Sequence, residues 1–94
     1  MKVLKGKKTK LVKALVKAQR AQNYLEGERN IELFIWMDGD VKDIIPAKWY
    51  KGDYISIETL DKQVTKLSKK YEKIELVLPS DIYEFYEIEL YTKQ

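Results

Sequence analysis

The sequence contains no cysteine and no histidine. Without a thiol there is no disulfide bond, no cysteine nucleophile and no zinc-thiolate centre. Without an imidazole there is no histidine base and no ordinary transition-metal site, so Ser-His-Asp, Cys-His and zinc-hydrolase mechanisms are excluded together. We therefore expect a protein that is not an enzyme and that holds neither a metal nor a cofactor.

Glycine and long apolar runs are also scarce. Only four glycines are present and none belongs to a phosphate-binding loop, which argues against nucleotide hydrolysis and dinucleotide chemistry. No run of about 18 apolar residues exists, and Lys10, Lys13 and Lys17 interrupt the N-terminal stretch where a signal peptide would be apolar. We therefore expect a cytoplasmic protein without a membrane span.

The chain nevertheless has the apolar content of a folded domain. Its 94 residues are 45% hydrophobic and 12% aromatic, which suffices for one small core. Residues 1–8 are basic and are the one candidate for a flexible extension, whereas residues 9–94 are expected to form a single domain.

The spacing of apolar residues predicts the order of the elements. The expected elements are a helix over residues 9–25, strands over 31–37, 41–45 and 54–58, a helix over 59–71, and strands over 74–78 and 82–92. Thr9 and Thr59 are the expected N-caps, Gly27 the expected helix end, and Asp38-Gly39-Asp40 the turn of a hairpin. The predicted fold is α+β, a two-layer, mainly antiparallel sheet of four to five strands with two helices on one face, in the order α-β-β-β-α-β-β.

The first five of these elements resemble a known family. Over residues 9–71 the order α-β-β-β-α, together with lysines on the second helix, is similar to that of a double-stranded-RNA-binding domain. The chain departs from that family because it has no histidine for the loop that enters the minor groove, and because two further strands follow.

Charge is distributed unevenly along the chain. The net charge is +3, yet residues 1–25 carry eight basic side chains and no acidic one, and the remainder carries 10 basic and 15 acidic. On the first helix, Lys10, Lys13, Lys17 and Arg20 are three or four residues apart and therefore share one face. Such a row, about 15 Å long, predicts a nucleic-acid-binding protein, for DNA or RNA. A solvated lysine face and an anionic membrane surface are the alternatives.

Binding of single-stranded nucleic acid also needs aromatic side chains on which bases can stack. Trp49 and Tyr50, in the loop after Pro46, are the expected contacts of this kind. Phe34 and Trp36 would add to them if they faced outward, but the pattern of strand 31–37 leaves open which of its faces is buried. We favour the interpretation that one or both faces belong to the core.

Acidic and aromatic residues alternate near the C-terminus and predict a different surface. An acidic-aromatic strand face would suit a basic partner protein, and the chain would then be a small viral or plasmid-type inhibitor or regulator of a host protein. The candidate residues for this alternative are Tyr83, Glu84, Phe85, Glu87, Glu89 and Tyr91. The same strand could instead be solvated, or could pair in a homodimer through its edge or against the basic helix.

Three carboxylates lie around the predicted hairpin turn, at Asp38, Asp40 and Asp43. The sequence Asp40-Val41-Lys42 has the acid-x-Lys form found in many metal-dependent nucleases. In a chain with 15 acidic and 18 basic residues this form is nearly non-specific. We therefore interpret the segment as a turn.

Overall fold

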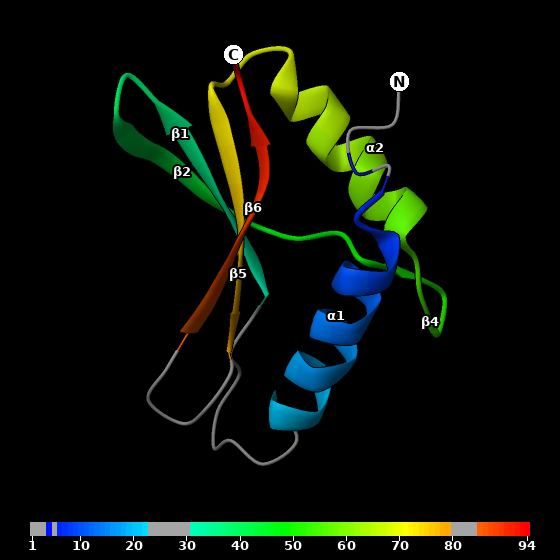
Figure 1. The fold of residues 1–94 in the computed structure, drawn as a ribbon. Helices are drawn as coiled ribbons and strands as arrows, with labels where there is room; N and C mark the ends of the chain where they lie inside the picture. Colours follow the sequence, from blue (N-terminus) through cyan, green and yellow to red (C-terminus); the bar gives the residue numbers. More distant parts are fainter. Residues whose placement is uncertain (1–3, 5, 23–30, 80–84) are drawn as a thin grey trace.

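The computed structural model describes residues 4, 6–22, 31–79 and 85–94. Its elements, in chain order, are α1 (Lys8–Gln22), β1 (Glu32–Met37), β2 (Asp40–Pro46), β3 (Tyr50–Lys51), β4 (Tyr54–Ile55), α2 (Ile57–Ser68), β5 (Lys73–Pro79) and β6 (Phe85–Thr92). Four strands form an antiparallel sheet in the order β2-β1-β5-β6, and β3 and β4 form a separate two-stranded sheet. Both helices lie on the same side of the large sheet (Figure 1). The predicted two-layer α+β fold is confirmed.

A two-residue turn joins β1 to β2, as the sequence predicts. Asp38 and Gly39 both have a positive φ, of 53° and 78°, and Met37 pairs with Asp40 across the turn. Two consecutive positive φ values define a type I′ turn, for which Asp-Gly is a favoured pair because glycine adopts this backbone without strain. The turn fixes the register of the hairpin.

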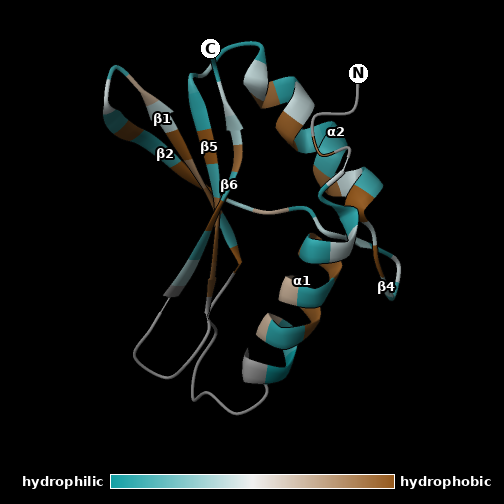
Figure 2. Ribbon diagram, viewed as in Figure 1, coloured by the Kyte–Doolittle hydropathy of each residue, from teal (hydrophilic) through white to brown (hydrophobic). Residues whose placement is uncertain are grey.

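The core lies between the sheet and the helices. Leu11 and Leu15 of α1 and Leu60 and Val64 of α2 are fully buried against the apolar side of the sheet. The buried residues on that side are Ile31, which directly precedes β1, and the strand residues Leu33, Ile35, Ile74, Leu76, Leu78, Ile88 and Leu90. Hydrophobic and hydrophilic segments alternate along both helices and the strands (Figure 2), so each element offers one side to the core.

The second helix begins earlier than predicted. Ser56, not Thr59, is its N-cap, because the Ser56 Oγ accepts a hydrogen bond from the Thr59 backbone N–H at 3.2 Å. Ile57 then belongs to the helix and is buried. The strand predicted over 54–58 is shortened to β4, which pairs only with β3. The additional strand changes the order to α-β-β-β-β-α-β-β, so the order matches that of a double-stranded-RNA-binding domain only over the first four elements, and the third strand pairs in a separate sheet.

The first helix begins at Lys8, so Thr9 lies inside it. Ahead of the helix, Leu4 is buried, and its backbone N–H donates to the Asp61 carboxylate of α2 at 3.0 Å. The Lys7 ammonium group donates to the backbone carbonyl of Glu89 in β6 at 3.0 Å. Two residues of the predicted flexible extension are therefore attached to the domain. Gly27, the predicted helix end, lies outside the described residues.

Candidate nucleic-acid interface

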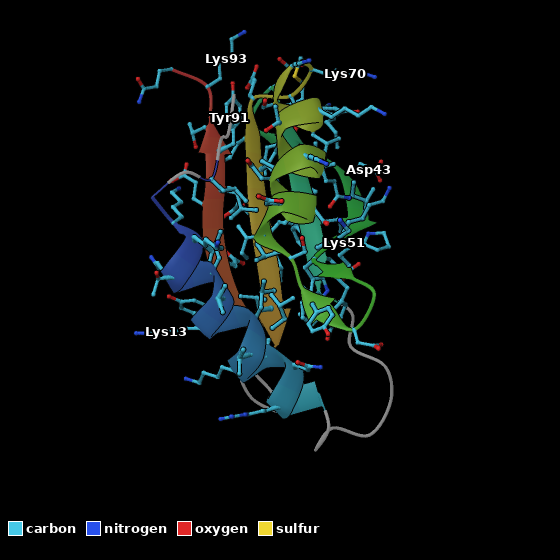
Figure 3. The ribbon with its side chains drawn as sticks, turned by 90° about the vertical axis from the view of Figure 1, so that its right-hand side faces the viewer. Lys13, Asp43, Lys51, Lys70, Tyr91 and Lys93 are labelled. Carbon is cyan, nitrogen blue, oxygen red and sulfur yellow. The ribbon has the colours of Figure 1, made fainter. Side chains whose placement is uncertain are left out.

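The cations of α1 face the solvent. Lys10, Lys13, Lys17 and Arg20 are all exposed, and the helix Lys8–Gln22 contains no acidic residue. Because Leu11 and Leu15 fill the opposite side of the helix, the helical period directs these four side chains away from the core. Figure 3 shows Lys13 at the outer side of α1. The structure thus brings the four predicted cations onto one exposed surface.

A groove runs beside this surface, between α1 and the neighbouring ends of β5 and β6. It encloses about 250 Å³, and we call it the α1 groove. Its lining consists of Lys10, Lys13, Ala14, Lys17, Ala18, Leu78 and Tyr86. The two alanines have short side chains, which leaves space above Leu78. Tyr86 is 48% exposed, so the groove combines three lysines with an accessible aromatic residue.

Tyr86 is not among the predicted site residues, because the alternation of the last strand groups it with the apolar Ile88 and Leu90 on one face. Tyr86 is opposite Leu78, on the side of the sheet that faces the helices. The small side chains of α1 at positions 14 and 18 line the same groove and do not cover the ring. An alanine pair on the facing helix was the one sequence signal for this exposure.

A second basic groove lies on the other flank of the helical layer. It encloses about 590 Å³ beside α2, and its cations are Lys48, Lys62, Lys66 and Lys70; we call it the α2 groove. Gln63 holds the loop at its edge, because its side-chain amide accepts from the Lys48 backbone N–H at 2.7 Å and donates to the Pro46 carbonyl at 3.1 Å. Lys13 and Lys70 mark the two opposite flanks in Figure 3.

The aromatic ring of the α2 groove is less accessible than Tyr86. Tyr71 is partly buried, and the Lys70 ammonium group lies 5.4 Å from the centre of its ring. A cation within about 6 Å of an aromatic face interacts favourably with it. The α2 groove therefore has cations comparable to those of the α1 groove, but its ring already has a cation beside it.

Trp49 and Tyr50, predicted to be stacking residues, are not part of the α1 groove. Trp49 is 7% exposed and belongs to the core, so its ring cannot receive a base. The Tyr50 ring packs on Trp49 with 3.8 Å between ring centres, and partial burial raises the pKa of the Tyr50 hydroxyl. For Trp49 the prediction is wrong, because the ring is large and apolar and completes the core beside α2.

The other two aromatic candidates, Phe34 and Trp36, face away from both helices. They alternate in β1 with the buried Leu33 and Ile35, so they occupy the opposite side of the sheet. The Lys73 ammonium group lies 4.9 Å from the centre of the Trp36 ring. The question that the sequence left open is thereby answered, since the core side of this strand carries the aliphatic residues.

The acidic-aromatic surface predicted on the last strand is only partly present. Glu87 and Glu89 are exposed and lie on the same side of the sheet as Phe34. Tyr91 pairs with Ile74 and packs against the core, because the register shifts between Ile74 and Glu75 and leaves an additional residue in β6. The placement of Tyr91 with the glutamates is therefore wrong. Tyr83, Glu84 and the side chain of Phe85 lie outside the described part of the chain.

Asp38, Asp40 and Asp43 are exposed around the β1–β2 turn, and the Asp43 carboxylate accepts a hydrogen bond from the Ile44 backbone N–H at 2.9 Å. Within residues 4, 6–22, 31–79 and 85–94, no three acidic side chains are grouped so that they could hold a metal ion.

Neither described helix is long and apolar enough to cross a membrane.

Comparison of the chain with protein-family models, curated proteins and solved structures gives no match. The site is therefore interpreted from the chemistry and geometry of its own side chains.

Proposed function

We propose that the protein is a small, non-enzymatic nucleic-acid-binding protein that receives a single strand in the α1 groove. The observation that supports this proposal best is the presence of three lysines and an exposed tyrosine ring in one groove. Lysine ammonium groups bind phosphate oxygens, and a ring accepts an unpaired base by stacking. A cytoplasmic location is part of the same proposal.

Each feature of the groove has a role in this proposal. Lys10, Lys13 and Lys17 extend over about 10 Å of helix and would contact successive phosphates. Arg20 continues the row and adds a donor that can bind a phosphate with two hydrogen bonds. Tyr86 stands on the sheet side of the groove, where it would stack with a base whose phosphate is bound by α1.

The test is the affinity for a fluorescently labelled single-stranded oligonucleotide about 12 residues long, measured by anisotropy over a range of salt concentrations. The logarithm of the association constant should fall linearly with the logarithm of the salt concentration. Replacing Lys10, Lys13 and Lys17 together by alanine should reduce the slope by about 2, since each single-strand phosphate contact contributes about 0.7. The affinity at about 100 mM salt should fall by at least roughly tenfold.

The α2 groove provides a matched control. Replacing Lys62, Lys66 and Lys70 by alanine removes the same charge from the opposite flank of the helical layer. This variant should keep most of the affinity. Equal losses in the two triple variants would mean that only the net charge of the chain matters, and the proposed site would then be wrong.

The alternative function, an inhibitor that meets a basic host protein through its last strand, has weaker support as first formulated. Among its candidate residues in the described part of the chain, Glu87 and Glu89 lie together on one exposed face, whereas Tyr91 packs toward the core. A homodimer through the edge of the same strand remains a proposal that light scattering tests directly.

A further inference from the structure

The side of the large sheet that faces away from the helices is not covered by any described element (Figure 1), and we call it the open face. The strand register shows which residues lie on the open face, since directly paired residues share a face of the sheet. Trp36 pairs with Val41, and Phe34 pairs with Ile44. These four side chains, the aromatic centre of the open face, lie next to one another on two adjacent strands.

The aromatic centre is accessible to a partner. Val41 is 37% exposed and Ile44 is 47% exposed, both on the edge strand β2, while Phe34 and Trp36 are partly exposed beside them. Single apolar side chains on a surface are ordinary, but a contiguous group on an uncovered sheet face marks an interaction surface. The Trp36 Nε1 atom is buried and has no hydrogen-bond partner among the described residues.

Carboxylates lie beside the aromatic centre, on β1, β5 and β6. Glu75 pairs with Phe34 on one side and with Glu89 on the other, and Val77 pairs with Glu32 and Glu87. We call Glu32, Glu75, Glu87 and Glu89 the acidic rim. A cation, Lys73, lies among these carboxylates, and its ammonium group is 3.9 Å from the Glu75 carboxylate and above the Trp36 ring.

This charge decides which occupant the open face can take. The acidic rim repels a nucleic-acid strand, and it repels the open face of a second copy, because carboxylates would meet carboxylates. The α1 helix of a second copy offers cations, but its leucines are buried in its own core and would leave the aromatic centre uncovered. The occupant must therefore bring both cations and free aliphatic side chains.

We propose that the open face docks a basic segment of another protein, in which lysine or arginine residues alternate with aliphatic residues. The aliphatic side chains pack on Phe34 and Ile44, and the cations pair with Glu87 and Glu89. Since the α1 groove lies on the helical side of the sheet, the two surfaces can be occupied at the same time. The open-face proposal does not depend on the proposed nucleic-acid binding.

The experiment follows backbone amide shifts of the ¹⁵N-labelled full chain during titration with three synthetic octapeptides. One alternates lysine with leucine, one alternates lysine with glycine, and one alternates glutamate with leucine. Only the lysine-leucine peptide should bind saturably, with the largest shifts in β1, β2 and β6 at Phe34, Ile44 and Glu87. Equal binding of the lysine-glycine peptide, or shifts centred on α1 or α2, would overturn the proposal.

Two pairs of charge reversals complete the test. Glu87→Lys with Glu89→Lys should weaken binding of the lysine-leucine peptide by about tenfold. The matched control, Asp53→Lys with Glu58→Lys, changes the net charge equally at exposed positions on β3–β4 and α2, and should stay within about twofold. Circular dichroism confirms that each variant is folded before titration. An equal loss in both pairs, or concentration-dependent shifts in the aromatic centre that show a second copy bound there, would rule the docking surface out.

Discussion

The two sides of the sheet carry opposite chemistry. On the helical side lysines of α1 and α2 line the two grooves, whereas the open face has the four carboxylates of the acidic rim beside Lys73. The net charge of +3, a sum over the whole chain, hides the difference between these two surfaces. Neighbouring residues of one strand, such as Leu33 and Phe34, belong to different sides because side chains alternate along a strand. An asymmetry that the sequence shows along the chain becomes an asymmetry across the layers.

The largest effect that separates the two sides should be in stability. Leu33→Ala removes a fully buried side chain between the sheet and the helices and should lower the free energy of unfolding by about 2–5 kcal/mol. Ile44→Ala, on the open face, should cost less than about 1 kcal/mol because nearly half of that side chain is already exposed. Urea unfolding followed by circular dichroism measures both changes.

The opposite result of these unfolding measurements would also be informative. A loss for Ile44→Ala as large as that for Leu33→Ala would show that the open face is covered in solution, by residues outside the described part or by a second copy. Repeating the unfolding at a tenfold lower protein concentration separates these two, since only a second copy makes the stability depend on concentration.

The elements themselves follow well from local patterns. Helical spacing places the four cations on one side of α1, and the Asp38-Gly39 turn sets the first hairpin. What local patterns do not contain is the register between distant strands. The shift beside Glu75, which turns Tyr91 toward the core, has no mark in the sequence, because a bulge adds one residue to one strand without a required side chain.

Exposure is equally non-local. Trp49 is buried and Tyr86 is half exposed, although both are large aromatic residues with a charged residue on one side and an aromatic residue on the other. Each outcome depends on the element that lies above the ring: the region around Trp49 is part of the core, whereas Tyr86 meets the alanines of α1. Helical periodicity therefore predicts where the cations of α1 lie. It does not predict which aromatic residue is exposed for stacking, because that depends on contacts between distant elements.

A smaller effect concerns the assembly of the helical layer. The buried Asp61 carboxylate accepts from the Leu4 backbone N–H at 3.0 Å and from the Thr65 hydroxyl at 3.4 Å. Asp61→Ala leaves the Leu4 donor without its partner, which should lower the free energy of unfolding by about 1.5–3 kcal/mol. Asp61→Asn retains an acceptor oxygen and should recover part of that loss.

Hydrogen exchange of the Leu4 amide, read by NMR, checks this interpretation directly. Exchange should be fast in Asp61→Ala and slower in Asp61→Asn. Unchanged protection of Leu4 in the alanine variant would mean that the chain ahead of α1 is held by packing alone. The sheet amides of β1 and β5 serve as the internal reference, because they report the global stability.

The smallest effect that we expect tests the ring of the α1 groove without changing any charge. Tyr86→Ala should weaken single-strand binding by about 1–3 kcal/mol, the usual contribution of one base stacked on an aromatic side chain. Tyr54→Ala is the matched control, because Tyr54 is the more exposed tyrosine, at 78%, and lies on β4 outside the groove. Tyr86→Phe should change the affinity by less than about 0.5 kcal/mol, since stacking needs the ring and not the hydroxyl group. If the phenylalanine variant instead loses as much as the alanine variant, then Tyr86 acts through a hydrogen bond of its hydroxyl group, and the α1 groove recognises a phosphate or sugar at that point rather than a base.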